Sequence, residues 1–157
     1  MYIVHQLSVV VLELQGYNET ACEGHSLYRS FIPVMMDIES FWKDVLHQRR
    51  EALRAYFADD AVIRWHCSNE QFTVDEYVRA NCDYPGEWDG TIERIDIIEN
   101  GYVTAVKVYP PDHSAHFHVV SFIHVKDGLV TSLDEYWADD GDAPDWRKEM
   151  RIGKPIH

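Results

Sequence analysis

Carboxylates and aromatic rings crowd one short stretch near the end of the chain, "SLDEYWADDGDAPDW" at residues 132–146. Six of its fifteen side chains are acidic, which is the composition of a calcium-binding loop. Such a loop needs oxygen ligands at alternate positions, glycine at the sixth and glutamate at the twelfth. Counting from Asp140 puts Pro144 fifth, and counting from Asp139 puts Gly141 third. The pattern therefore predicts an acidic loop after a strand, in which Trp146 either folds back over a cavity or patches the core.

Glu135, inside the same stretch, is the strongest candidate for acid/base chemistry. It stands between Leu133 and Trp137 in strand-like alternation, which would point it at an apolar interior. A buried carboxyl group has its charged form disfavoured, so its pKa moves toward useful acid/base values. An ion pair with Arg64 or Arg94, or exposure to solvent, are the alternatives.

His66 is the second catalytic candidate, because it ends a predicted strand and imidazole titrates near neutrality. It could equally be an exposed residue at the strand end. His116 and His118 form an HxH pair on one strand face, as metal ligands do, but no acid follows at fitting spacing. We therefore predict neither a metal nor a cofactor and assign these histidines to a sheet face that is solvated or pairs with a second copy.

The elements that position these residues change type along the chain. Apolar residues at helical spacing predict a helix from Ile38 to Leu46, and a second helical set leads into the strand "FADDAVIRW". "TVDE" at 73–76 is a capping box that starts another helix. Four β-type runs follow, separated by the turns "ENG", "PPD" and "KDG". Helices followed by an antiparallel meander predict an α+β fold with the helices on the concave face of one curved sheet.

The last hairpin decides which face Glu135 occupies. A three-residue "KDG" loop pairs Val125 with Leu129 and places Ser121 and Phe117 on the face of Glu135. A two-residue "DG" loop instead places Glu135 among the histidines. We favour the first register because it groups the carboxylate with apolar side chains.

This order of elements resembles the nuclear transport factor 2-like superfamily, and within it the SnoaL-like group. The residues that carry the resemblance are "YFADDAVIRWH", the capped helix and "KDGLVTSLDEYW", over about 36–146. It implies a cone-shaped α+β barrel with an apolar pocket at its open end, in a homodimer formed through the sheet. Proteins of this superfamily share one fold but have several different activities, so the resemblance alone does not name a reaction.

The resemblance separates some of those activities. The positions of the catalytic Asp, Tyr and acid of ketosteroid isomerases correspond here to Trp65, Phe41 and Ser121. Because indole cannot accept a proton, that activity is disfavoured. The Asp-Arg-Asp set of limonene epoxide hydrolases is not evident. The His/Asp pairing of SnoaL-type cyclases and scytalone dehydratases would need His66 or a meander histidine as base.

Composition sets the remaining expectations. The chain has 157 residues and a formal charge of −13, which disfavours nucleic acid and anionic membrane surfaces. Three separated cysteines favour a reducing compartment, which we take as the cytoplasm. We expect residues 1–34 to form an extension, either an appendage or a docking segment, before a domain at 35–150 and a tail at 151–157. Its apolar run is too short for a bilayer and lacks the features of a secretory signal.

We therefore expect a protein that binds a small apolar molecule, either as a cofactor-free isomerase, cyclase or dehydratase or as a non-catalytic module. In the module, aromatic side chains would fill the interior and leave no volume for a ligand. Glu135 and His66 are the predicted acid/base residues. The predicted pocket residues are Trp65, Tyr77, Asn81, Tyr84, Trp88, Phe117, Ser121, Leu133 and Trp137.

Overall fold

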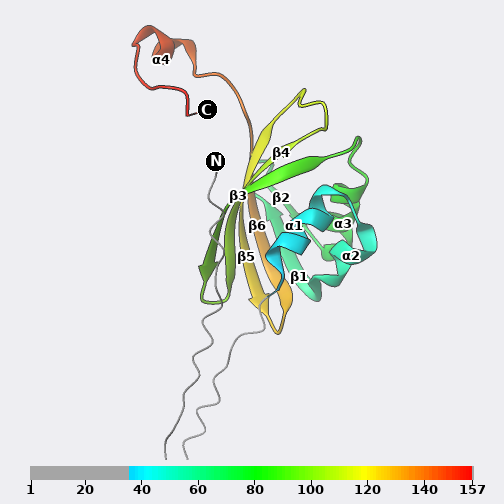
Figure 1. The fold of residues 1–157 in the computed structure, drawn as a ribbon. Coiled ribbons are helices and arrows are strands. Elements are labelled where there is room, and N and C mark those ends of the chain that lie inside the picture. Colours follow the sequence, from blue (N-terminus) through cyan, green and yellow to red (C-terminus); the bar gives the residue numbers. More distant parts are fainter. Residues whose placement is uncertain (1–35, 157) are drawn as a thin grey trace, which may run out of the picture. The chain divides into compact units, whose positions relative to one another are not determined.

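A computed structural model describes residues 36–156, so the predicted extension at 1–34 lies outside the described residues. The helices are α1 (Ile38–Leu46), α2 (Arg50–Ala55), α3 (Val74–Cys82) and α4 (Asp145–Glu149). The strands are β1 (Phe57–Trp65), β2 (Glu70–Phe72), β3 (Asp89–Ile98), β4 (Gly101–Tyr109), β5 (Phe117–Lys126) and β6 (Leu129–Asp139). Figure 1 shows α1, α2 and α3 together on one side of a curved sheet.

The predicted helix starts are confirmed by their caps. Asp37 accepts a hydrogen bond from the backbone N–H of Ser40, which opens α1. Thr73 and Glu76 form the reciprocal capping box that opens α3. The buried apolar face of α1 consists of the residues that the helical spacing had indicated: Ile38, Phe41, Trp42, Val45 and Leu46.

The six strands lie in the order β2-β1-β6-β5-β4-β3. The predicted antiparallel meander is confirmed for β3 to β6. Two features were not predicted: β1 pairs in parallel with β6, and the short strand β2 folds back on β1. Among the described strands β2 and β3 remain the two edges, so the α+β fold is a curved sheet wrapped around helices that does not close into a complete barrel.

The β5–β6 hairpin has a different loop from the one we predicted and the same facing. Lys126 pairs with Leu129, so the loop is the two-residue Asp127-Gly128, with both residues at positive φ. A register shift then leaves Thr131 unpaired, as in a β-bulge. Because one extra residue reverses the alternation of faces, Glu135 returns to the side of Ser121, with which it pairs.

The core lies between α1, α3 and the concave face of the sheet. Phe41, Leu53, Ile63 and Val119 are fully buried there. Trp42 of α1 donates its indole N–H to Thr104 of β4 across 3.2 Å, which ties the first helix to the sheet. No described helix is long and apolar enough to cross a membrane.

Candidate functional site

An apolar cavity of about 440 Å³ opens between the helices and the concave face of the sheet. Its volume is in the range that holds a small molecule. The interior is therefore not filled by aromatic side chains, as it would be in the non-catalytic module considered above. The lining residues come from α1, α3, the loops and five strands: Val45, Leu46, Gln48, Trp65, Cys67, Ser68, Glu70, Ala80, Asn81, Tyr84, Trp88, Val108, Phe117 and Trp137.

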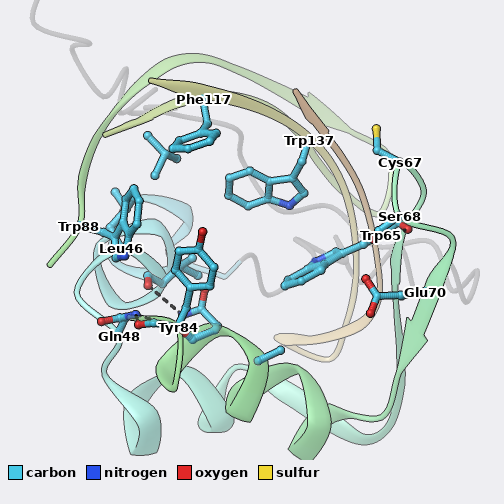
Figure 2. A pocket seen from close by; sticks show the side chains of 14 residues that line it. Leu46, Gln48, Trp65, Cys67, Ser68, Glu70, Tyr84, Trp88, Phe117 and Trp137 are labelled. Atoms are coloured by element: carbon cyan, nitrogen blue, oxygen red, sulfur yellow. Dashed lines mark hydrogen bonds between the residues drawn. The ribbon is translucent and has the colours of Figure 1, made fainter. Parts of the chain in front are cut away.

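Five aromatic rings lie in the wall of this cavity. Figure 2 shows Trp65, Trp137 and Phe117, which belong to the sheet, arranged around the hollow with Tyr84 and Trp88. The ring centroids of Trp65 and Trp137 lie 6.4 Å apart, and those of Trp88 and Phe117 lie 5.8 Å apart. These edge-to-face contacts hold the rings against one another and leave the space between them open.

Glu135 lies directly behind this wall, with 1% of its surface exposed. Its Oε2 accepts hydrogen bonds from the indole N–H of Trp65 at 2.7 Å and of Trp137 at 3.2 Å. Its Oε1 accepts one from the hydroxyl of Ser121 at 3.0 Å. The sheet produces this arrangement, because Trp65 and Ser121 flank Glu135 on neighbouring strands and Trp137 follows two residues later on the same face.

Burial raises the pKa of Glu135, and the hydrogen bonds from Trp137, Ser121 and Trp65 offset part of that rise. The neutral form of this carboxyl group is thus easier to reach than in a solvent-exposed glutamate. However, it does not line the cavity, and both of its oxygens already have donors. What it does in this conformation is hold the two indoles in place.

The other predicted pocket residues separate into two layers. Trp65, Asn81, Tyr84, Trp88, Phe117 and Trp137 line the cavity. Tyr77, Ser121 and Leu133 are buried behind the lining and do not reach it. Burial raises the pKa of Tyr77 well above its ordinary range, so this phenol stays neutral. Its ring packs against that of Trp65, with the two ring centroids 6.2 Å apart.

The structure does not bring His66 to the cavity. Its side chain lies on the outer face, where Nε2 contacts Asp134 Oδ1 at 2.7 Å and the ring stacks on Tyr136. The reason is strand alternation: Trp65 points inward from β1, so the following residue points outward. A proton relay between His66 and Glu135 would have to cross the sheet, so this pair is corrected to a single interior carboxyl group.

Gln48 and Glu70, two polar residues of the lining, were not among the predicted pocket residues, whereas Asn81 was. Gln48 donates its amide to the backbone carbonyls of Asn81 and Tyr84, which ties the α1–α2 turn to the end of α3. Asn81 donates to the carbonyl of Val45, so its amide N–H has a structural role. Glu70 lies on the short strand β2. Its position on β2, which no periodicity indicated, brings its carboxylate to the cavity.

The histidine pair and the acidic loop lie away from the cavity lining. His118 contacts Glu93 through Nε2 at 3.2 Å and Asp140 through Nδ1, and these carboxylates raise its pKa, Asp140 most strongly. Trp146 belongs to α4, which buries none of its side chains, and it is 60% exposed. It therefore does not fold back over the cavity. In residues 36–156 no group of three or more His, Cys, Asp or Glu side chains is arranged to hold a metal ion.

Known structures of similar shape show the fold. A candidate ketosteroid isomerase from Kribbella flavida is 23% identical, with a TM-score of 0.64 over 75% of this chain and 87% of that one. A nuclear transport factor 2-like protein of unknown function from Burkholderia xenovorans is 19% identical, with a TM-score of 0.62 over 75% and 91%. A candidate SnoaL-like polyketide cyclase from Shewanella putrefaciens is 12% identical, with a TM-score of 0.52 over 64% and 75%.

No protein-family model matches the chain, and no curated protein matches it. The chain thus has the nuclear transport factor 2-like fold, as the resemblance of its sequence implied. At these identities the likeness shows the fold alone, and the neighbours differ in the activities named for them.

Proposed function

We propose that this protein binds a small, largely apolar molecule in the aromatic cavity. The observation that carries the proposal is an open hollow of about 440 Å³ whose wall is mainly tryptophan, tyrosine, phenylalanine and aliphatic side chains. Packing such rings without filling the space between them leaves apolar surface that a ligand would bury. The few polar groups at its edge suit orientation of the ligand.

A cofactor-free acid/base enzyme, such as an isomerase, cyclase or dehydratase, is the second candidate. The raised pKa of Glu135, one layer behind the cavity, favours it. Proton transfer to a ligand would require Trp65 and Trp137 to move aside, because their N–H groups occupy the carboxylate. We therefore rank ligand binding ahead of catalysis.

We also propose that two copies pair through the outer face of the sheet. Val120, Phe122 and Tyr136 are 37%, 40% and 45% exposed on that face, and Val120 is the cross-strand partner of Tyr136. Apolar side chains gathered on one sheet face are typical of a surface that a partner covers. The exposed free thiol of Cys67 supports a reducing location such as the cytoplasm.

Filling the cavity tests the binding proposal. Ala80 lines the cavity from α3, and Arg79 is its exposed neighbour on the same helix. Ala80→Trp should weaken binding of the neutral apolar dye N-phenyl-1-naphthylamine at least about tenfold, because the new indole takes the ligand's volume. Arg79→Trp, the matched control, should leave the dye fluorescence titration unchanged.

Circular dichroism of both variants separates loss of binding from loss of folding, and Ala80→Leu is the milder replacement if the indole is not accommodated. Dye binding that both variants retain, or a wild-type protein that binds no dye, would contradict the proposal.

A further inference from the structure

The charges around the cavity are one-sided. Among the described residues that line it there is no lysine, arginine or histidine, and one carboxylate, Glu70. The faces of aromatic rings carry the negative part of their quadrupole, so a wall of five rings adds to the same sign. The protein as a whole has a formal charge of −13. A cation is therefore favoured over an anion both on approach and inside.

Glu70 lies beside the tryptophan wall because of the β1–β2 pairing. Trp65 and Glu70 are direct cross-strand partners, so their side chains leave the sheet on the same face. Figure 2 shows the Glu70 carboxylate close to the Trp65 ring at the edge of the cavity. Residues 36–156 provide no ion-pair partner for it, whereas Asp134 on the outer face has Arg64 and His66.

The carboxyl group behind the wall acts in the same direction. Trp65 and Trp137 both donate their indole N–H groups to Glu135, which does not line the cavity, so these two donors are already occupied. Neither Trp65 nor Trp137 therefore offers a free indole N–H to an anionic ligand in the cavity.

A compact, strongly hydrated ammonium such as that of lysine would lose its water on entering and find few acceptors in this wall. A cation whose charge is covered by alkyl groups loses less hydration and matches the aromatic faces. We infer that the cavity takes an apolar cation, a tertiary or quaternary ammonium attached to a small apolar body, in preference to a neutral molecule of the same shape. This inference rests on the proposed binding function and names its ligand class.

Two isosteres isolate the charge. The 3-hydroxyphenyltrimethylammonium ion and 3-tert-butylphenol differ in having nitrogen or carbon at the centre of the branched group, and 3-tert-butylbenzoate supplies the opposite charge. Isothermal titration at low salt should show the ammonium binding about tenfold more tightly than the phenol, and the benzoate more weakly than both. Raising the salt concentration should reduce the preference, since Glu70 is exposed at the edge.

Glu70→Gln supplies the second readout. It should lower the affinity for the ammonium about threefold to tenfold and leave the affinity for the phenol unchanged. Glu99→Gln changes the net charge by the same amount at the exposed β3–β4 turn and should change neither affinity.

Equal or tighter binding of the phenol would overturn the inference, and so would an ammonium affinity that Glu70→Gln does not alter. In both cases retained binding of the naphthylamine dye would leave the proposed function standing. Loss of dye binding from the wild type would remove the proposed function itself.

Discussion

Asp134 and Glu135 are adjacent carboxylic acids on β6 that face opposite environments. Asp134 points to the outer face, where it pairs with Arg64 at 3.3 Å and His66 at 2.7 Å, and its side chain is 22% exposed. Glu135 points inward, is 1% exposed, and receives neutral donors alone. The concave face thus uses a carboxyl group to organise aromatic rings, whereas the outer face uses one in a solvated charge network.

Removing the two carboxyl groups should have very different effects. Glu135→Ala leaves the two indole N–H groups and the Ser121 hydroxyl without their acceptor and opens a hole, so we expect a loss of about 3 kcal/mol in the free energy of unfolding. Asp134→Ala, the neighbouring control, should cost less than about 1 kcal/mol, because its partners remain in contact with water. Urea titration measures both values.

Glu135→Gln refines the same test, since its amide oxygen can still accept from the indoles while its NH₂ faces the Ser121 oxygen. It should therefore retain most of the stability that Glu135→Ala loses. Equal losses for the Ala variants at 134 and 135 would show that the inner carboxyl group does not organise the wall.

The next prediction concerns the outer face of the sheet. Its exposed apolar residues lie among charged ones and would be covered by a second copy in the proposed dimer. Phe122→Glu places a charge at the centre of the proposed dimer surface, so the dissociation constant of the dimer should rise at least about thirtyfold. Sedimentation velocity at micromolar concentration measures it.

Ile152→Glu, at a 55% exposed position after α4, is the control that adds the same charge elsewhere. A wild-type chain that sediments as an 18.3 kDa monomer would refute the pairing.

The smallest effect is the pH dependence of the inner carboxyl group. Burial raises the pKa of folded Glu135 above its ordinary value of 4.5, so below that value both folded and unfolded chains carry the protonated form. As the pH rises, the unfolded chain ionises first and gains stability relative to the folded chain. The contribution of Glu135 to folding is therefore complete below pH 4.5 and is lost through the folded pKa, by at most about 1.4 kcal/mol per pH unit.

Comparing the free energies of unfolding of wild type and Glu135→Gln at several pH values isolates the pH-dependent contribution of Glu135, because glutamine does not titrate. The stability of the wild type relative to the variant should fall between pH 4.5 and neutrality. A constant difference across that range would mean that the folded pKa is not raised.

Much of the fold could be predicted from local patterns. The helical spacing of α1, the capping box of α3 and the antiparallel succession of β3 to β6 follow from neighbouring residues, and the structure confirms them. The facing of Glu135 was also predicted, although the two-residue loop and the Thr131 bulge that produce it were not. Two departures from the expected loop cancelled, since each reverses the alternation once.

The candidate site could be predicted in part. Alternation along single strands indicated Trp65, Phe117 and Trp137, which line the cavity. It could not indicate which residues stand in front and which behind, so Tyr77, Ser121 and Leu133 were assigned to a surface that they do not reach. His66 follows Trp65 directly in the sequence, and consecutive residues of a strand point to opposite faces of the sheet. Because Trp65 points inward, His66 lies on the outer face and not at the cavity.

The amino-acid order by itself determined the α+β class, the apolar stripes and the alternation that puts a carboxyl group inside, because these depend on residues a few positions apart. Tertiary structure decided the parallel pairing of β1 with β6 and the return of β2. The β1–β6 pairing joins residues about 70 positions apart, Trp65 to Glu135, and the β1–β2 pairing brings Glu70 beside Trp65. The long-range contact depends on how the sheet curves around the helices, and the short strand β2 carries no periodicity of its own, so the organised wall and its edge carboxylate exist only in the folded chain.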